Sequence, residues 1–351
     1  MRKTVLMMPA LIALASFSVA SETVLPESPS NDTSVQAVTP MLASQEEIRE
    51  ETALDLLMRF QHAFHHLNYE LAYIEVRQGH IEPVRFIHGL VDDVQISHRV
   101  YLNGPAHEAV YRANKVAYFE AGQPPYSLTS KRLPGIFGNL AALEAERLSA
   151  NYELVIAGKS RVAGRPAQVM RIVPKSADMY GLYLWLDFNS ALPLRIDIVD
   201  RQGDLVEQHM AVSLIEFSKP NEWMQELASI DLPSVVTGAN LDASEELQVD
   251  WQLGWKPVGM EVRAREQHSL VLLSESVDYM QLGDGLFDVS VYINPIGTTS
   301  PLREHLVRQG ATSLHTVVRN GIEITVVGEI PPETASRIAD SVKFSPRLEQ
   351  P

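Results

Sequence analysis

The chain has 351 residues, 45% of them hydrophobic, and this length exceeds what one hydrophobic core usually organises, so two folded domains are expected. A formal charge of −15 argues against a nucleic-acid partner and against membrane adhesion through Lys and Arg, because both need basic patches. The absence of cysteine excludes disulfides, thiolate nucleophiles and Cys-ligated zinc.

Residues 1–20 have the parts of an export signal. Arg2 and Lys3 precede an apolar run, and small residues end the run at Ala20, where a signal peptidase would cut. The run is shorter than the roughly 20 residues that a membrane span requires. No cysteine follows the predicted cleavage site, which excludes a lipoprotein anchor. The sequence therefore predicts a soluble periplasmic chain that begins at Ser21.

The next segment, residues 21–43, is rich in Ser, Thr, Pro and Val without an apolar period, which predicts a disordered leader. Ser44 with Glu47 three residues later has the form of a capping box. It opens a predicted helix that ends near Asn68. The helix carries an apolar stripe on one face. That stripe comprises Leu56, Phe60, Ala63 and Leu67, flanked by Ala53, Leu57 and Phe64.

The chain from the first helix to residue 217 predicts one long antiparallel sheet. Strands are expected at 69–79, 84–91, 94–102, 109–112 and 116–120, followed by a short helix at 137–148. Five more strands are expected at 152–158, 167–173, 179–188, 194–198 and 205–217. Short turns separate these five, so sequential neighbours should pair as a meander.

A sheet with so many strands must curl, and its concave face must be filled by the helices or by a ligand. Apolar side chains of the first helix and of two strands are the candidates for a lipid-binding wall. They are Leu56, Phe60, Phe64, Leu184, Leu186, Ile196 and Ile198. A closed hydrophobic core remains the alternative for the same residues.

Residues 231–246, which follow a short helix at 223–227, have the composition of a linker. We therefore expect a large domain at 44–230, a small domain at 247–344 and a tail at 345–351. In the small domain, strands are expected at 247–253, 260–265, 276–282 and 286–293, with helices at 301–309 and from Pro331 to about 342. Asn320-Gly321 lies between two apolar runs and predicts a type I′ hairpin. The predicted fold class is mainly β, of the α+β type.

A search for catalytic motifs returns negatives. Gly158-Lys159-Ser160 leads into a turn and not into the helix of a phosphate loop, and no Gly-x-Ser-x-Gly elbow occurs. His62 and His66 lie four apart on the first helix, a spacing that can hold a metal. No intervening Glu or third ligand accompanies them, which favours surface histidines. The sequence predicts a binding protein without a cofactor, a metal or catalysis.

Several motifs resemble the periplasmic RseB/MucB regulators of envelope-stress sigma factors of the sigma-E or AlgU type. In the large domain they are Leu67-Asn68-Tyr69-Glu70-Leu71, Tyr118-Phe119-Glu120, Val162-Ala163-Gly164-Arg165, Met179-Tyr180-Gly181, Leu184-Trp185-Leu186-Asp187 and Leu192-Pro193-Leu194-Arg195. In the small domain they are Asp284-Gly285-Leu286-Phe287 and Arg337-Ile338-Ala339. The resemblance covers about residues 44–344.

This resemblance implies a large domain similar to the lipoprotein carriers LolA and LolB, a half-open β-barrel closed by helices, and a small antiparallel C-terminal domain. It also implies a function. The chain would bind the periplasmic part of an anti-sigma factor of the RseA/MucA type, shield it from a DegS-type site-1 protease, and release it when lipopolysaccharide or a related lipid binds. A periplasmic lipid or lipoprotein carrier is the alternative, and homo-oligomerisation is left open.

The small domain is the expected partner-binding domain, because a carrier-like domain alone accounts for a lipid and not for a protein partner. An exposed sheet edge can accept an extended peptide, and aromatic side chains can anchor it. The candidate anchors are Trp251, Trp255, Phe287 and Tyr292.

Overall fold

The computed structural model describes residues 51–236, 250–269, 276–296 and 304–344. The export signal, the leader and the capping box expected at Ser44 and Glu47 lie outside these ranges. The first described helix, α1 (Ala53–His66), has a capping box of its own. The Asp55 N–H donates to the Thr52 hydroxyl at 3.1 Å, and the Thr52 N–H donates to the Asp55 carboxylate at 3.0 Å.

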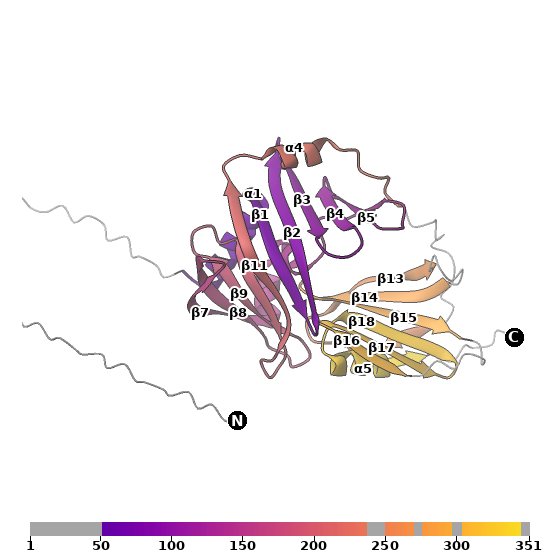
Figure 1. Ribbon diagram of the computed structural model, residues 1–351. Helices are drawn as coiled ribbons and strands as arrows, with labels where there is room; N and C mark the ends of the chain where they lie inside the picture. Colours follow the sequence, from indigo (N-terminus) through magenta and orange to yellow (C-terminus); the bar gives the residue numbers. More distant parts are fainter. Residues whose placement is uncertain (1–50, 237–249, 270–275, 297–303, 345–351) are drawn as a thin grey trace, which may run out of the picture. The chain divides into compact units, whose positions relative to one another are not determined.

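The large sheet has eleven antiparallel strands in two meanders (Figure 1). The first contains β1 (Asn68–Arg77), β2 (His80–Val91), β3 (Val94–Tyr101), β4 (His107–Arg112), β5 (Lys115–Glu120) and β6 (Tyr126–Thr129). The second contains β7 (Tyr152–Val162), β8 (Arg165–Pro174), β9 (Gly181–Asp187), β10 (Pro193–Val199) and β11 (Leu205–Phe217). Pairing of β1 with β11 joins the meanders, and the sheet stays open between its edge strands β6 and β7. The predicted fold class is confirmed.

Three helices supply apolar side chains to one face of this sheet. Phe60 and Phe64 of α1 are buried, and the Phe64 ring stacks on Phe86 of β2 with centroids 5.7 Å apart. The single helix predicted at 137–148 is instead two helices, α2 (Ile136–Ala142) and α3 (Ala145–Asn151). The break comes at Leu143, whose backbone is extended. Gln61 of α1 donates to the Leu140 and Leu143 carbonyls, which satisfies the end of α2 without a continued helix.

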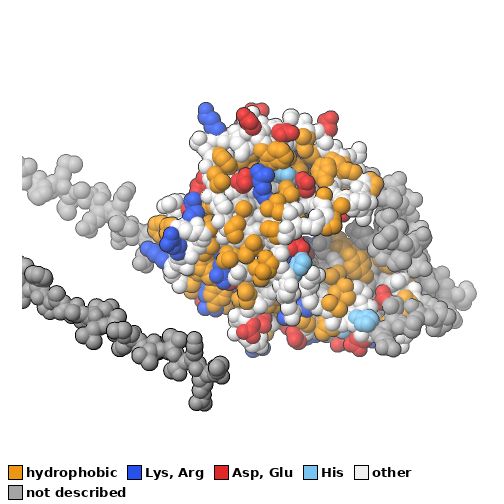
Figure 2. Space-filling model, viewed as in Figure 1, with side chains coloured by type: hydrophobic (Ala, Val, Ile, Leu, Met, Phe, Trp, Pro, Cys, Tyr) orange, Lys and Arg blue, Asp and Glu red, His pale blue; other side chains and the backbone are white. Residues whose placement is uncertain are grey.

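The opposite face of the large sheet mixes apolar and charged side chains (Figure 2). Exposed apolar side chains there include Val212 and Ile215 of β11. The Trp185 ring is covered by a cation, because the Arg195 guanidinium lies 4.3 Å from its centroid. Scattered apolar side chains of this kind are normal on a protein surface.

The two edges of the large sheet differ. After α4 (Glu222–Ser229), the chain returns along β6, where the Val236 N–H donates to the Ser127 carbonyl at 2.8 Å and the Ser127 hydroxyl donates to the Pro233 carbonyl. This segment covers the outer edge of β6. At the other end of the sheet, β7 pairs with β8 along one side.

The C-terminal sheet has the strand order β13-β14-β15-β18-β17-β16. Its strands are β13 (Glu261–Ser269), β14 (Ser276–Gly283), β15 (Asp288–Pro295), β16 (His305–Gln309), β17 (Thr312–Arg319) and β18 (Ile322–Glu329). Helix α5 (Pro332–Ser341) packs on it, and β12 (Trp251–Leu253) pairs with β19 (Val342–Phe344). Positive φ angles of 54° and 74° at Asn320 and Gly321 confirm the predicted type I′ hairpin.

The helix predicted at 301–309 is wrong for its described part, because residues 305–309 form β16. All five side chains of β16 are exposed, so backbone pairing, and not burial of an apolar face, holds this segment in place. The edge of β17 instead offers backbone partners from His305 opposite Thr316 to Gln309 opposite Thr312.

Candidate binding site

A cavity of about 90 Å³ lies between the helix-covered face of the large sheet and the loop that leads into α2. Its apolar wall includes Phe64, Phe86, Tyr111, Phe137 and Ile198. An engineered cavity of about 150 Å³ holds benzene, so this space is smaller than one aromatic ring requires. An acyl chain can enter only if part of the wall moves.

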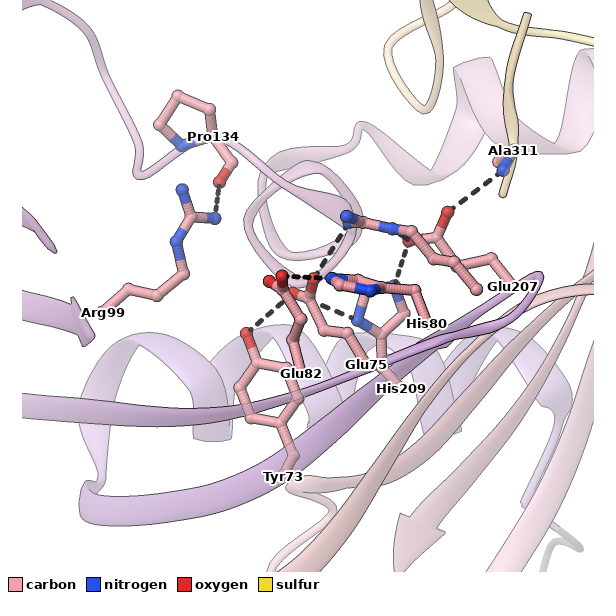
Figure 3. Close-up of polar contacts among 10 residues, drawn as sticks. Tyr73, Glu75, His80, Glu82, Arg99, Pro134, Glu207, His209 and Ala311 are labelled. Carbon is pink, nitrogen blue, oxygen red and sulfur yellow. Dashed lines mark hydrogen bonds and ion pairs between the residues drawn. The ribbon is translucent and has the colours of Figure 1, made fainter. Parts of the chain in front are cut away.

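The loop at 131–135, which leads into α2, forms the roof of the cavity, and Arg99 holds it in place. The Arg99 guanidinium of β3 donates to the Pro134 carbonyl at 2.7 Å (Figure 3). Gly135 has a φ of 126°, and a Cβ there would come 3.0 Å from the same guanidinium. Glycine therefore lets the roof approach Arg99 closely.

The floor of the cavity is a cluster of buried charges on β1 and β11. The strand register places Arg77 opposite Glu207 and Glu75 opposite His209. Arg77 contacts both carboxylates, at 2.9 Å to Glu75 and 3.1 Å to Glu207. His209 lies 3.1 Å from Glu207 through Nε2 and 3.6 Å from Glu75 through Nδ1. Glu75, Glu207 and His209 are at most 6% exposed, so these contacts replace the water that the charges lose.

The partners of Glu207 keep it ionised despite its burial. Burial raises the pKa of this carboxyl, but the hydrogen bond and charge of His209, the charge of Arg77 and the Ala311 N–H outweigh burial. The pKa of Glu207 falls to about 2. A fixed negative charge is therefore held at the floor of the cavity.

The C-terminal sheet reaches this floor through two segments. The Ala311 N–H, in the β16–β17 turn, donates to Oε2 of Glu207 at 3.0 Å (Figure 3). Glu329, at the end of β18, lines the cavity. Burial raises the pKa of Glu329 to about 7, and the charges of Glu207 and Asp288 add to the rise. The cavity is thus bounded by residues of both sheets.

Further polar contacts connect the large sheet and its helices with the C-terminal sheet. Asn139 of α2 accepts from Arg132 Nε at 2.9 Å and donates to the Leu286 carbonyl at 3.0 Å. Thr334 of α5 donates to the Asp178 carbonyl at 3.0 Å. The cavity roof therefore contacts the turn between β14 and β15 through Asn139.

Two of the seven residues of the predicted lipid-binding wall line the cavity, and the other five do not. Phe64 and Ile198 line the cavity. The remaining five candidates are at most 1% exposed, belong to the packed core and do not line the cavity. They are Leu56, Phe60, Leu184, Leu186 and Ile196. Phe60 contacts the cavity wall indirectly, since its ring centroid is 5.7 Å from that of Phe64.

The four predicted partner anchors also differ in exposure. Trp251 and Phe287 are at most 1% exposed and belong to the core. Trp255 is half-buried, with the Arg337 guanidinium 3.8 Å from its ring centroid. Tyr292 is half-buried on β15, with its ring 5.1 Å from that of Tyr279. Trp255 and Tyr292 are therefore only partly covered by the protein's own side chains.

Sequence reasoning missed the floor of the cavity, although a signal was present. On β1 the inward side chains run Tyr69, Leu71, Tyr73 and then Glu75, and the buried side chains of β11 include Glu207 and His209. A charged residue at a position where alternation demands an apolar one indicates a buried polar site. The pairing of β1 with β11, some 130 residues apart in sequence, could not be read from that pattern.

Two further observations concern a metal site and a membrane-spanning helix. The His62 and His66 rings stack with centroids 4.2 Å apart at the end of α1, and no group of three potential metal ligands gathers within the described ranges. In the part of the chain that the structure describes, no helix is both long enough and apolar enough to cross a membrane.

Comparison with known proteins gives matches over both sheets. The family models for the MucB/RseB N-terminal domain and the MucB/RseB C-terminal domain match residues 52–236 and 245–343. The chain is 31% identical to the Sigma-E factor regulatory protein RseB of Escherichia coli K12, over 82% of this chain and 90% of that protein. It is 27% identical to the Sigma factor AlgU regulatory protein MucB of Pseudomonas aeruginosa, over 83% and 90%.

Two solved structures have a similar fold. The Pseudomonas aeruginosa MucA/MucB complex contains a chain that superposes with a TM-score of 0.65 at 23% identity, covering 84% of this chain and 99% of that one. A crystal structure of MucB in complex with MucA(peri) gives a TM-score of 0.64 at 25% identity, with the same coverage.

Proposed function

Because the chain belongs to the MucB/RseB family, we propose that it is a periplasmic regulator that binds the periplasmic domain of a membrane anti-sigma factor of the RseA/MucA type. The observation that carries this proposal is the match over both family domains, at 31% identity to RseB over most of the chain. The solved complex of the similar MucB with MucA supports the same kind of partner. We propose no catalytic role.

The proposed consequence of binding is protection. A bound anti-sigma segment is withheld from a DegS-type site-1 protease, which must take an extended chain into its active site. The membrane anti-sigma factor then stays intact and restrains the envelope-stress sigma factor. Lipopolysaccharide or a related lipid would relieve this protection. By linkage, the lipid must weaken the partner by the same factor by which the partner weakens the lipid.

We place the lipid in the cavity of the large domain. Its wall offers Phe64, Phe86 and Ile198, while Arg99 and Lys131 supply cations at the roof. Such a combination suits an amphiphile with apolar chains and an anionic head group. Because the cavity of about 90 Å³ is small, entry of a chain requires displacement of the roof loop.

We place the partner on the C-terminal sheet. Strand β16 pairs with β17 on one side and lies at the edge of the sheet. Leu306 and Val307 on this strand are 50% and 57% exposed. An extended peptide can add to such an edge through its backbone, with apolar side chains giving selectivity. The family model for the MucB/RseB C-terminal domain covers this sheet.

The test uses the full-length protein and the purified periplasmic segment of the anti-sigma factor from the same organism. Calorimetric titration should give a specific complex, and the complex should slow cleavage of the segment by a DegS-type protease. Val307→Lys should weaken the complex by about tenfold, because lysine on an edge strand discourages strand addition. Val258→Lys, at a 73% exposed position outside the strands, is the matched control.

Two outcomes would revise the proposal. If wild-type protein forms no complex, the regulatory function is wrong. If Val307→Lys and Val258→Lys bind alike, the partner surface lies elsewhere than β16. The alternative, a periplasmic lipid or lipoprotein carrier, predicts transfer of a labelled lipid between vesicle populations without any anti-sigma segment, and a regulator should show none.

A further inference from the structure

We propose that the Arg77–Glu207 pair and the Gly310–Ala311 turn form a latch that joins the cavity to the C-terminal sheet, and that an occupant of the cavity opens it. This inference rests on the proposed function, because it names how lipid binding would reach the partner. The latch is a direct contact: Glu207 accepts the Ala311 N–H at 3.0 Å while Arg77 holds the other carboxylate oxygen at 3.1 Å (Figure 3).

The backbone of the Gly310–Ala311 turn lies very close to the side chains of Arg77 and Glu207. Gly310 has a φ of 60°, and a Cβ there would lie 2.4 Å from Oε2 of Glu207 and 3.1 Å from Cγ and Cδ of Arg77. Real Cβ atoms do not approach that closely, so glycine alone lets the turn reach the pair. Ala311 is 1% exposed, which leaves its N–H no access to water. If Glu207 moves away, this donor loses its partner, and the turn is destabilised.

The opposite side of the same cluster contacts Phe137, which lines the cavity. The Phe137 ring of α2 packs edge-on against Tyr73 at 5.2 Å and against His209 at 5.6 Å. Tyr73 donates to Glu75, and His209 contacts Glu207. Phe137 follows directly on the roof loop that must move to admit a ligand.

These contacts form one continuous path. Phe137, in the first turn of α2, touches His209, His209 touches Glu207, and Glu207 touches Ala311. A ligand that lifts Phe137 removes the packing that orients His209. Glu207 then loses one of the two side chains, His209 and Arg77, that hold it against the turn. Buried charges depend on well-placed partners. A small displacement of Phe137 is therefore enough to disrupt the contacts of the cluster with the turn.

The first test measures the latch itself by hydrogen–deuterium exchange in full-length protein. The probe is dansyl-labelled undecanoic acid, whose fluorescence reports its own binding. At saturating probe, exchange at the Ala311 amide should accelerate by about tenfold, within the usual range of coupling between sites. The amide of Val291, in the buried strand β15 of the same sheet, should not change. Unchanged exchange at Ala311 with probe bound would overturn the latch.

The second test opens the latch without touching a residue that lines the cavity. Gly310→Ala drives a Cβ into Glu207, whereas Gly321→Ala has a similar left-handed φ of 74° and meets nothing closer than 3.7 Å. Both variants carry the same backbone strain, so the second is a control for the first. Gly310→Ala should bind the anti-sigma segment about tenfold more weakly and the probe more tightly, and the probe should no longer weaken the segment.

The outcomes separate this inference from the proposed function. If wild-type protein binds the probe but not the anti-sigma segment, the proposed function fails, and exchange at Ala311 still decides the latch. If wild-type protein binds both and the probe weakens the segment equally in Gly310→Ala and Gly321→Ala, the function stands and the latch is wrong. If the probe does not bind at all, both the lipid response and the latch are wrong.

Discussion

The Tyr152 hydroxyl donates a 2.6 Å hydrogen bond to Oδ2 of Asp284, which ties the first strand of the second meander to the turn between β14 and β15. The other carboxylate oxygen accepts the N–H groups of Leu286 and Phe287 at 2.8 Å. Burial raises the pKa of Tyr152 well above its usual value, and Asp284 adds to the rise, so the hydroxyl remains a donor. One buried carboxylate therefore organises the turn and its contact with the large sheet.

Tyr152→Phe keeps the ring and removes this donor. The buried carboxylate then has one partner fewer, and the free energy of unfolding should fall by about 1–3 kcal/mol, measured by urea denaturation. Tyr183→Phe, in a half-buried ring on the outer face, is the control and should change it by less than about 0.5 kcal/mol. Equal effects of the two changes would contradict a special role for the contact with Asp284.

Arg99 should control access to the cavity, because its guanidinium holds the roof at the Pro134 carbonyl. Arg99→Ala removes a charge-assisted hydrogen bond, so the roof opens more often and the dansyl probe should associate about tenfold faster in stopped-flow measurements. Arg161→Ala removes an exposed arginine on the edge strand β7 and should leave the rate unchanged. An unaltered rate in Arg99→Ala would show that ligands enter by another route.

Glu329 should make stability depend on pH. Its pKa in the folded protein is about 7, above its usual value of 4.5, so between these values the folded state holds a proton that the unfolded state has lost. Its ionisation therefore lowers the free energy of unfolding as pH rises from 4.5 to 7, by about 3 kcal/mol in all. Glu329→Gln should remove this loss.

His88 has the opposite effect on the pH dependence of stability. Burial lowers its pKa from 6.5 to about 4, so the protein loses stability as pH falls through that interval. The difference between wild type and variant, measured at several pH values, isolates Glu329. Glu323→Gln makes the same change at a more exposed site on β18, where burial raises the pKa less. If the free energy of unfolding of Glu329→Gln falls with pH as steeply as that of the wild type, another group causes the loss of stability.

Asp187 should be a structural residue, although it lies in one of the motifs that carry the resemblance to the family. Its carboxylate accepts from Arg165 at 2.7 Å and from the Ser190 N–H at 2.9 Å, which fixes the turn between β9 and β10. Asp187→Asn loses the ion pair and should cost about 2 kcal/mol of unfolding free energy. Binding of the anti-sigma segment should be unaffected at temperatures where the variant is folded. Asp200→Asn, in an exposed turn, is the control.

The candidate site was predicted only in part. Phe64 and Ile198 lie on the apolar faces of an amphipathic helix and strand, so their inward direction follows from sequence spacing. The same spacing cannot distinguish a cavity wall from a filled core, and Leu184 and Ile196 are core. Whether space remains beside an inward side chain depends on how the helices pack against it, which involves residues far apart in the chain.

The local chemistry of the chain determined most of its elements. Period-two alternation produced the second meander in the predicted order, and Asn320-Gly321 produced its hairpin, because both depend on residues close in sequence. Tertiary structure decided the rest: residues 305–309 became a strand because β17 offered them an edge, and Glu75, Arg77, Glu207 and His209 became a charged floor because β1 pairs with β11. Burial and long-range pairing set the energy of such groups, and neither is a property of the local sequence.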